Sequence, residues 1–184
     1  MVPTIMVGDH FFLDKIAFPG NFPEAVRHWL PRRQISRGDI IAFRPPPKAG
    51  MTTPFVKRVI GVPGDTIEVR NREVYLNNEI TNEPYKIHIF PTSAGDNYGP
   101  VTVPEDQFFV MGDNRDNSND SRFWGFVDRD SIIGKPLFVY WSYESDSPYE
   151  TTERSWATIA ADYGSVAQHF FSRTRWFRFG TMVR

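Results

Sequence analysis

A lysine inside an apolar run, next to an arginine, is the residue best suited to acid–base chemistry. Lys57 and Arg58 lie in residues 55–60 (FVKRVI), and alternation along a strand would place them on opposite faces. Burial favours the neutral form of a lysine, whereas an arginine keeps its charge. A neutral Lys57 is therefore able to take the proton of a serine hydroxyl. The plainer interpretation is a lysine whose charged end reaches water from a half-buried strand.

A polar loop at residues 112–125 (GDNRDNSNDSRFWG) follows an apolar run and holds many donors, acceptors and turn-forming residues. Its own side chains have to organise it. We expect charge-assisted pairs that build a rigid platform, with one hydroxyl on it that orients the Lys57 amine. The carboxylates are Asp113, Asp116 and Asp120, and their expected partners are Arg115, Arg122 or Arg58. A solvated cluster of turns is the alternative.

Metal chemistry and other enzyme chemistries have little support in the sequence. Counted from Asp116, the alternating oxygens of a calcium loop fall on Ser118 and Asp120. The sixth and twelfth positions, however, are Ser121 and Val127, where such a loop needs Gly and Glu. The histidines are scattered, and neither His-Glu-x-x-His nor Gly-x-Ser-x-Gly occurs. We therefore expect no metal and no organic cofactor.

Short β-branched and aromatic runs, each bounded by Gly, Pro, Asn or Asp, predict a mainly β protein. Asn77-Asn78 predicts a hairpin, since asparagine tolerates positive φ. The strand at 55–60 would hold Lys57, and the polar loop would begin where the strand at 107–111 ends. The sequence predicts strands at residues 39–43, 55–60, 66–69, 73–76, 107–111 and 137–141.

The length of 184 residues allows one hydrophobic core with a small insertion. Between residues 71 and 105 the composition becomes polar and rich in turn-forming residues, so we place a small inserted β lobe there. Residues 1–70 and 106–184 then form one discontinuous core. Within it, apolar residues at intervals of three and four predict a helix near residues 153–171.

The composition limits the partners of the protein. A net charge of −1 and a pI of about 6.4 give no reason to expect nucleic-acid binding, and we expect a monomer. No cysteine is present, which excludes thiol catalysis. No apolar run reaches the ~20 residues needed to cross a bilayer. Phe11-Phe12, Trp141 and Trp176-Phe177 are candidates for contact with a membrane surface, with core packing as the alternative for Phe11 and Phe12.

Four segments in order along the chain resemble the conserved boxes of the bacterial type I signal peptidases. Residues 1–9 (MVPTIMVGD) are similar to the box built on Ser-Met-x-Pro-Thr, and residues 37–43 (RGDIIAF) to the second box. Residues 57–65 (KRVIGVPGD) are similar to the third, and residues 112–125 to the last. The resemblance runs to about Trp141. It implies a signal peptidase/LexA-like antiparallel β catalytic core and a serine endopeptidase that removes signal peptides from exported preproteins.

The resemblance also implies a role for each matching residue. Lys57 would be the general base, and Ser118, not Ser121, would hydrogen-bond its amine. Structural ion pairs would involve Arg58, Asp120 and Arg122. The residues that would line shallow pockets for the small side chains before the cleaved bond are Met1, Ile5, Phe11, Ala42, Phe55 and Val56. An extended substrate would add as a strand to a sheet edge.

A nucleophilic serine immediately before Met1, with a second serine two places earlier, also follows from the resemblance. Since neither is in the sequence, we expect these 184 residues alone to be inactive. Either the sequence begins at an internal methionine of a longer protein, which we favour, or a natural homologue has lost cleavage. A longer protein would carry a transmembrane anchor and hold the catalytic body on the extracytoplasmic (periplasmic) side of the cytoplasmic membrane.

Two other functions stay open at this point. A self-cleaving repressor domain of the LexA type shares serine/lysine chemistry, but such domains lack a loop as long as residues 112–125. A non-catalytic peptide-binding homologue would keep the groove without the nucleophile. A stop codon in frame just upstream of the Met1 codon would favour the peptide-binding protein.

Overall fold

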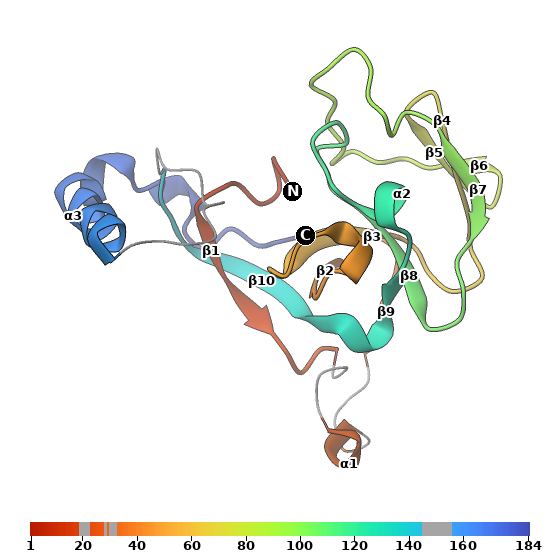
Figure 1. Cartoon of the computed structure of the whole chain (residues 1–184), viewed down its shortest axis with the longest axis horizontal. Helices are drawn as coiled ribbons and strands as arrows, with labels where there is room; N and C mark the ends of the chain where they lie inside the picture. Colours follow the sequence, from red (N-terminus) through yellow and green to blue (C-terminus); the bar gives the residue numbers. More distant parts are fainter. Residues whose placement is uncertain (19–22, 28, 30–32, 145–155) are drawn as a thin grey trace.

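Two antiparallel β-sheets form the framework of the protein (Figure 1). The computed structural model describes residues 1–18, 23–27, 29, 33–144 and 156–184. One sheet has six strands in the order β1-β10-β2-β3-β8-β9, and the other has four strands in the order β6-β5-β4-β7. The mainly antiparallel β fold predicted from the sequence is therefore confirmed.

The six-stranded sheet holds the segments of the candidate site. Its strands are β1 (Asp9–Asp14), β2 (Ile40–Phe43), β3 (Phe55–Gly61), β8 (Gln107–Met111), β9 (Val127–Asp128) and β10 (Ile132–Ser142). β3 lies between β2 and β8, with Lys57 opposite Ile41 of β2 and Arg58 opposite Met111 of β8. Because Met111 ends β8, the polar loop begins directly beside these two basic residues.

The four-stranded sheet forms a lobe beside the larger sheet, at the upper right of Figure 1. Its strands are β4 (Thr66–Arg70), β5 (Glu73–Leu76), β6 (Glu79–Ile80) and β7 (Tyr98–Thr102). Asn77 and Asn78 join β5 to β6 with φ of 52° and 72°, as the predicted hairpin requires. β4 belongs to this sheet although it precedes residue 71, where the sequence places the start of the lobe.

Helices are short except for one. They are α1 (Glu24–Arg27), α2 (Ser121–Trp124) and α3 (Trp156–Arg173), with 3-10 turns η2 (Pro47–Ala49), η3 (Arg129–Ser131) and η4 (Trp176–Arg178). The helix predicted near 153–171 corresponds to α3; residues 153–155 lie outside the described residues. Across the described part of the chain, no helix has the length and apolar character that crossing a membrane requires.

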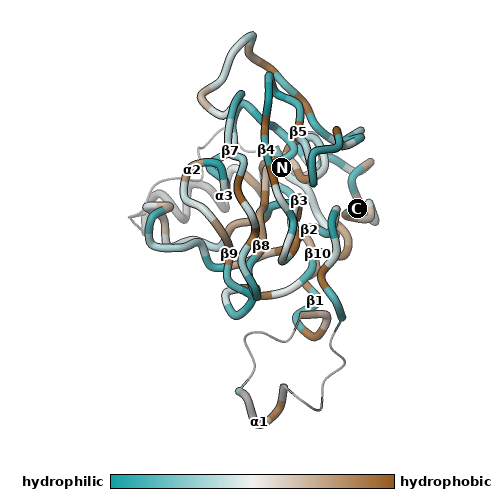
Figure 2. The backbone as a smooth tube through the Cα atoms, turned by 90° about the vertical axis from the view of Figure 1, so that its right-hand side faces the viewer, coloured by the Kyte–Doolittle hydropathy of each residue, from teal (hydrophilic) through white to brown (hydrophobic). Residues whose placement is uncertain are grey.

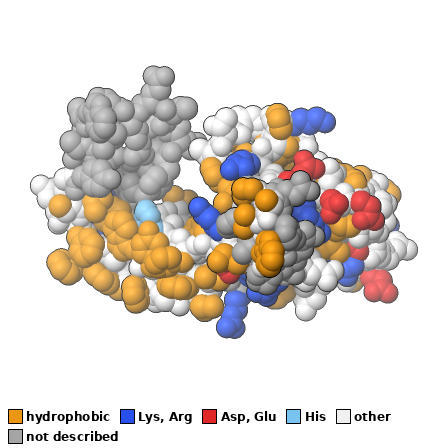
Figure 3. Space-filling view, turned by 90° about the horizontal axis from the view of Figure 1, so that it is seen from below, with side chains coloured by type: hydrophobic (Ala, Val, Ile, Leu, Met, Phe, Trp, Pro, Cys, Tyr) orange, Lys and Arg blue, Asp and Glu red, His pale blue; other side chains and the backbone are white. Residues whose placement is uncertain are grey.

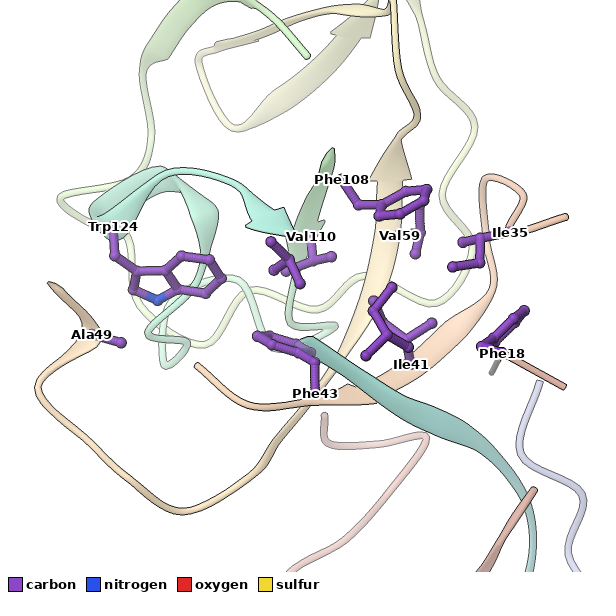
Figure 4. Packing of buried hydrophobic residues seen from close by; sticks show 11 residues of the cluster. Phe18, Ile35, Ile41, Phe43, Ala49, Val59, Phe108, Val110 and Trp124 are labelled. Carbon is purple, nitrogen blue, oxygen red and sulfur yellow. The ribbon is translucent and has the colours of Figure 1, made fainter. Parts of the chain in front are cut away.

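The main core lies on one face of β2, β3 and β8 (Figure 4). Alternating positions of these strands point to it, since strand side chains alternate between faces. Trp124 of α2 covers it, with its ring centroid 6.0 Å from that of Phe43. The buried members are Phe18, Ile35, Ile41, Phe43, Ala49, Val59, Phe108, Val110, Trp124, Val127 and Ile132.

A second buried cluster joins the lobe to the larger sheet. It contains Ile60, Ile67, Val69, Val74, Val103, Phe109 and Met111. β8 therefore contributes to a core on each of its faces, and brown hydrophobic stretches run through the strands in the middle of Figure 2. The polar loop thus emerges from a strand that packing holds on both sides.

All six strands predicted from the sequence occur, with boundaries within a few residues for all but the longer β10. Sequence reasoning missed the longer strands β1 and β7, as well as the two-residue β9. The pairing of β1 with β10 has two register shifts and its ends are aspartates. β7 contains Gly99 and Pro100, which are unfavourable in strands. Both strands form because tertiary pairing outweighs weak local preference.

Candidate active site

Lys57 lies in the middle of β3 with its amine directed at the polar loop. Its Nζ is hydrogen-bonded to Ser118 Oγ at 2.9 Å. The same nitrogen lies 5.4 Å from the ring centroid of Phe55, whose side chain shares its face of the strand. The structure therefore brings together the lysine and the serine that the sequence pairs across 61 residues.

Burial lowers the pKa of Lys57 because the charged amine loses hydration there. The negative charges of Asp120 and Asp113 act in the opposite direction, and the positive charge of Arg122 lowers the pKa further. Asp120 is itself paired with Arg122, and Asp113 with Arg58, so their effect on the amine is partly cancelled. At a given pH, a larger fraction of Lys57 is consequently in the neutral form than for a lysine in water.

Gly112 allows the loop to fold closely around Ser118. A β-carbon at Gly112 would lie 2.3 Å from Ser118 Oγ, 2.8 Å from Ser118 Cβ and 3.5 Å from Lys57 Nζ. The Gly112 amide also donates to Asp120 Oδ2 at 3.1 Å, which fastens the start of the loop to its end. The position needs glycine for space, because a larger residue would displace the serine.

Asp120 fixes the end of the loop by capping α2. Its carboxylate accepts from the Arg122 amide at 3.3 Å and from Arg122 Nε at 2.9 Å. The neighbouring Ser121 hydroxyl accepts from the Val110 amide at 2.9 Å. Ser121 is therefore engaged with β8, whereas the hydroxyl of Ser118 faces Lys57.

Arg58 forms a buried bidentate ion pair with Asp113. Its Nε and Nη2 each lie 2.9 Å from a carboxylate oxygen of Asp113. Asp113 also accepts from the hydroxyl of Thr4, and Arg58 Nη1 donates to the Gly38 carbonyl at 3.0 Å. The pair thus connects β3, the polar loop and the first residues of the structure.

Two further charged residues of the loop have partners that sequence reasoning missed. Arg115 Nη1 and Nη2 donate to the two carboxylate oxygens of Glu83 at 2.8 and 2.6 Å. Asp116 accepts from Arg72 at 2.8 Å and lies 2.9 Å from His88 Nδ1. We expected partners within the loop or at Arg58, and this expectation was wrong because the inserted lobe contributes them. In the sequence they resemble ordinary surface charges of a polar segment.

The residues expected to line substrate pockets lie on both faces of β3. Met1, Ile5, Phe11 and Val56 pack against Ile40, Val139 and Val183. Ala42 is buried opposite Val56 in the register of β2 and β3. Phe55 instead lies on the face of Lys57 and packs against the main core. Val183 is a member that the sequence did not predict, since it lies more than forty residues beyond the segments that carry the resemblance.

The backbone at the start of the structure adjoins Lys57. Burial lowers the pKa of the Met1 α-amino group, and the positive charge of Lys57 lowers it further. The effect of one positive charge on the other indicates that the Met1 nitrogen lies on the side of the structure that holds Lys57.

Within the described residues, no three His, Asp or Glu side chains converge as metal ligands. The carboxylates nearest Lys57 already bind guanidinium groups, Asp113 that of Arg58 and Asp120 that of Arg122. What the site offers to a substrate is a partly buried amine and a hydroxyl that holds it in place.

Known proteins share these segments. The family model for signal peptidase, peptidase S26, matches residues 1–141. A probable signal peptidase I-2 of Synechocystis sp. is 37% identical over 144 residues, covering 77% of this chain and 59% of that protein. Signal peptidase I of Leptolyngbya laminosa is 38% identical over 146 residues, covering 77% of this chain and 64% of that protein. The chain thus spans roughly three fifths of the length of these two relatives.

A crystal structure of a signal peptidase I from Enterococcus faecalis is 33% identical, with a TM-score of 0.45, and the match covers 57% of this chain and 98% of that one. The family match over residues 1–141 includes β3, β8 and the whole polar loop, and therefore every side chain of the Lys57 site described above except Val183. By this match over most of its length, the chain belongs to the signal peptidase family, peptidase S26.

Proposed function

We propose that this chain is the catalytic body of a signal peptidase I, a serine endopeptidase that removes signal peptides from exported preproteins. The observation that carries the proposal is the 2.9 Å contact between Lys57 Nζ and Ser118 Oγ, in surroundings that lower the pKa of Lys57. A buried amine aimed by a hydroxyl is the arrangement that a serine/lysine protease needs. Membership of the peptidase S26 family supports the same reaction class.

In this proposal the nucleophile is a serine that precedes Met1 in a longer chain. The positive charge of Lys57 lowers the pKa of the Met1 α-amino group, which supports placing a residue attached to Met1 in the neighbourhood of Nζ. Neutral Lys57 would take the hydroxyl proton as the serine oxygen attacks the carbonyl carbon of the scissile bond. The protonated amine would give that proton to the leaving nitrogen as the C–N bond breaks, and an acyl-enzyme ester would remain.

Water would complete the cycle with the same base. Lys57, neutral again, would take a proton from a water molecule as its oxygen adds to the ester carbonyl. The proton would return to the serine oxygen as the C–O bond breaks, which releases the carboxylic acid product. Because both steps begin with an uncharged amine, burial of Lys57 and its contact with Ser118 would influence both rates.

The apolar cluster around Val183 is the proposed binding surface for the small side chains that precede the cleaved bond. Its partly exposed members are Met1, Ile5, Phe11 and Val56. Alanine side chains suit shallow surfaces of this kind, in keeping with the Ala-x-Ala preference that the family resemblance implies. An extended substrate would gain affinity from backbone hydrogen bonds to a sheet edge.

A membrane surface is the second proposed partner. Figure 3 shows hydrophobic side chains gathered at the end of the molecule that carries α3. Among the side chains that the structure describes, the exposed aromatic ones of β1, β10, α3 and the segment after it are Phe12, Tyr140, Phe171, Trp176, Phe177 and Phe179. They adjoin a cleft of about 340 Å³ that Tyr140, Trp141, Phe170, Trp176 and Phe179 help to line.

The sequence around this aromatic surface favours an anionic lipid headgroup. Residues 163–184 contain four arginines and no aspartate or glutamate; Arg178 is buried and paired with Asp9, which leaves Arg173, Arg175 and Arg184. Aromatic and basic residues together bind the interface of anionic membranes. Phe11, by contrast, packs inside the cluster around Val183, and Trp141 is partly buried with its ring centroid 4.8 Å from that of His10. We propose Trp176 and Phe177 as the lipid contacts, on the extracytoplasmic side of the cytoplasmic membrane.

The test of the reaction uses a full-length protein with the residues that precede Met1. Lys57→Met removes the base and keeps an unbranched side chain, so processing of a preprotein should fall to background while circular dichroism stays unchanged. The matched control is Lys48→Met, since Lys48 is exposed in η2, and it should process at the wild-type rate. Retained processing by folded Lys57→Met would rule out the proposed base.

A further inference from the structure

The inserted lobe returns to the larger sheet along the loop that carries Ser118. Ile87 forms a parallel bridge with Asn114. The Ile87 amide donates to the Asp113 carbonyl at 2.9 Å, and the Arg115 amide donates to the Ile87 carbonyl at 3.0 Å. Residues 83–90, which we call the positioning segment, therefore lie beside the loop as an extended backbone would lie beside a strand.

Glu83 makes the most buried contact of this segment. Its carboxylate binds the Arg115 guanidinium in a bidentate pair, and both side chains are only 2% exposed. Arg115 Nε in turn donates to the Gly112 carbonyl at 3.2 Å, and Gly112 packs directly against Ser118. Arg115 and Gly112 thus connect Glu83 to Ser118, whose hydroxyl holds the Lys57 amine.

Tyr85 extends the contact to the other basic residue of β3. Its ring lies 3.9 Å from the guanidinium carbon of Arg58, and its hydroxyl donates to Glu83 Oε1 at 3.1 Å. Burial and then the charge of Glu83 raise the pKa of Tyr85, so the hydroxyl keeps the proton that it donates. The ring adds a cation–π contact to an arginine already paired with Asp113.

Asp116 fastens the far end of the segment two residues before Ser118. Its carboxylate accepts from the amides of Ile89 at 2.5 Å and Phe90 at 2.8 Å, and from Arg72 at 2.8 Å. Although burial acts in the opposite direction, hydrogen bonds from His88, the Phe90 amide and Arg72 hold the pKa of Asp116 well below its usual range. The carboxylate is therefore a fixed acceptor for the backbone of the lobe.

Other ion pairs of the lobe differ in burial. Glu73, which pairs with Lys86, keeps 42% of its side chain exposed, and Arg70, which pairs with Glu68, keeps 47%. Exposed pairs contribute little, whereas an unpaired buried charge is costly and forces its surroundings to move. The buried pair of Glu83 and Arg115, which faces the loop, is thus the ion pair of the lobe whose loss would displace its surroundings.

We infer that the positioning segment holds the catalytic loop in its working geometry and that Glu83 is a positioning residue for Lys57 and Ser118. The inference rests on the proposed function and adds to it a role for the inserted lobe. Loss of the Glu83 charge leaves the Arg115 guanidinium buried without its partner, so the loop shifts toward water. A displacement of about 1 Å in reacting groups costs up to about 100-fold in rate.

Glu83→Gln in the full-length protein tests this role because glutamine keeps the shape and loses the charge. With a preprotein peptide, kcat is expected to fall about 10- to 100-fold while KM changes less than about twofold. The acid limb of the pH profile should move to higher pH, since water that reaches Lys57 favours its charged form. A purely structural role would lower the amount of folded enzyme without moving the acid limb.

Glu68→Gln is the matched control, since it removes a lobe carboxylate that pairs with Arg70, outside the positioning segment, and its kcat and pH profile should equal those of the wild type. Folded Glu83→Gln with wild-type kcat and acid limb would overturn the inference. If Glu83→Gln does not fold, Asp116→Asn tests the positioning segment through the same two measurements, kcat and the acid limb of the pH profile. Wild-type values of both in folded Asp116→Asn would also overturn the inference. Processing by Lys57→Met would instead reject the proposed function itself, so the two failures are distinguishable.

Discussion

Ser118 Oγ lies 2.9 Å from Lys57 Nζ although the two residues are 61 positions apart in the chain. β3 carries the lysine, and the loop after β8 carries the serine. The register of β3 and β8, which places Arg58 opposite Met111, brings the two together. A slip of one residue would send Lys57 to the opposite face of the sheet, so the contact depends on strand register as well as on the loop.

Ser118→Ala should reduce kcat by about 100-fold in the full-length protein. The base is still present in this variant, but nothing holds its amine toward the nucleophile. KM should change little, because Ser118 is not among the residues of the apolar cluster around Val183. Steady-state kinetics with a preprotein peptide measure both constants. A kcat equal to that of the wild type would show that another group orients Lys57.

Gly112→Ala should also lower kcat, because the added β-carbon would lie 2.3 Å from Ser118 Oγ. We expect a loss of about 10- to 100-fold through displacement of the serine. Gly164→Ala is the matched control, since a β-carbon at Gly164 in α3 meets no atom within 4 Å. Rate measurements on the two folded variants check this, and equal rates would contradict the close packing at Gly112.

Local patterns in the sequence were sufficient to place Lys57 on a strand and to mark residues 112–125 as a polar loop that could supply a hydroxyl. Alternation of apolar residues fixes the face of Lys57 on its strand, and the density of turn-forming residues marks the loop. The strands and the hairpin at Asn77 and Asn78 follow from similarly local signals. The contact itself also required the family resemblance, because spacing alone does not tell which hydroxyl of the loop meets the amine.

The partners of the loop in the lobe could not be predicted in this way. Glu83 and Arg115 are separated by 32 residues, and neither has a neighbour in sequence that reveals its burial. Val183 enters the apolar cluster only because the end of the described chain pairs with β10, where the Val183 amide donates to the Leu137 carbonyl at 2.8 Å. Such contacts arise from tertiary topology, to which local periodicity is insensitive.

Asp113→Ala should destabilise the protein by about 3–5 kcal/mol, because it leaves the Arg58 charge buried without its partner. Urea unfolding followed by circular dichroism measures the change. Glu68→Ala removes the partner of Arg70, whose side chain is 47% exposed, and should leave the urea midpoint almost unchanged. Similar midpoints for the two variants would contradict the burial of the pair formed by Arg58 and Asp113.

Replacement of both Trp176 and Phe177 by serine should weaken binding to vesicles of anionic phospholipid by about tenfold or more. Both side chains are exposed, and arginines lie near them in the sequence. Ile80→Ser is the control, since Ile80 is an exposed apolar residue of the lobe. Co-sedimentation at low and high salt measures the binding. Equal binding by the double variant and the control would place the membrane contact elsewhere.

The most direct measurement is an NMR titration of Lys57 in this chain, labelled with ¹³C at the lysine ε-carbon and assigned with Lys57→Met. Because burial lowers the pKa of Lys57, its midpoint in the folded protein should lie below the ordinary value of about 10.4 and return to that value in urea. Processing by the full-length protein should then rise with pH through the lowered midpoint, since the neutral amine is the active form. A folded-state midpoint at or above about 10.4 would contradict the proposed base.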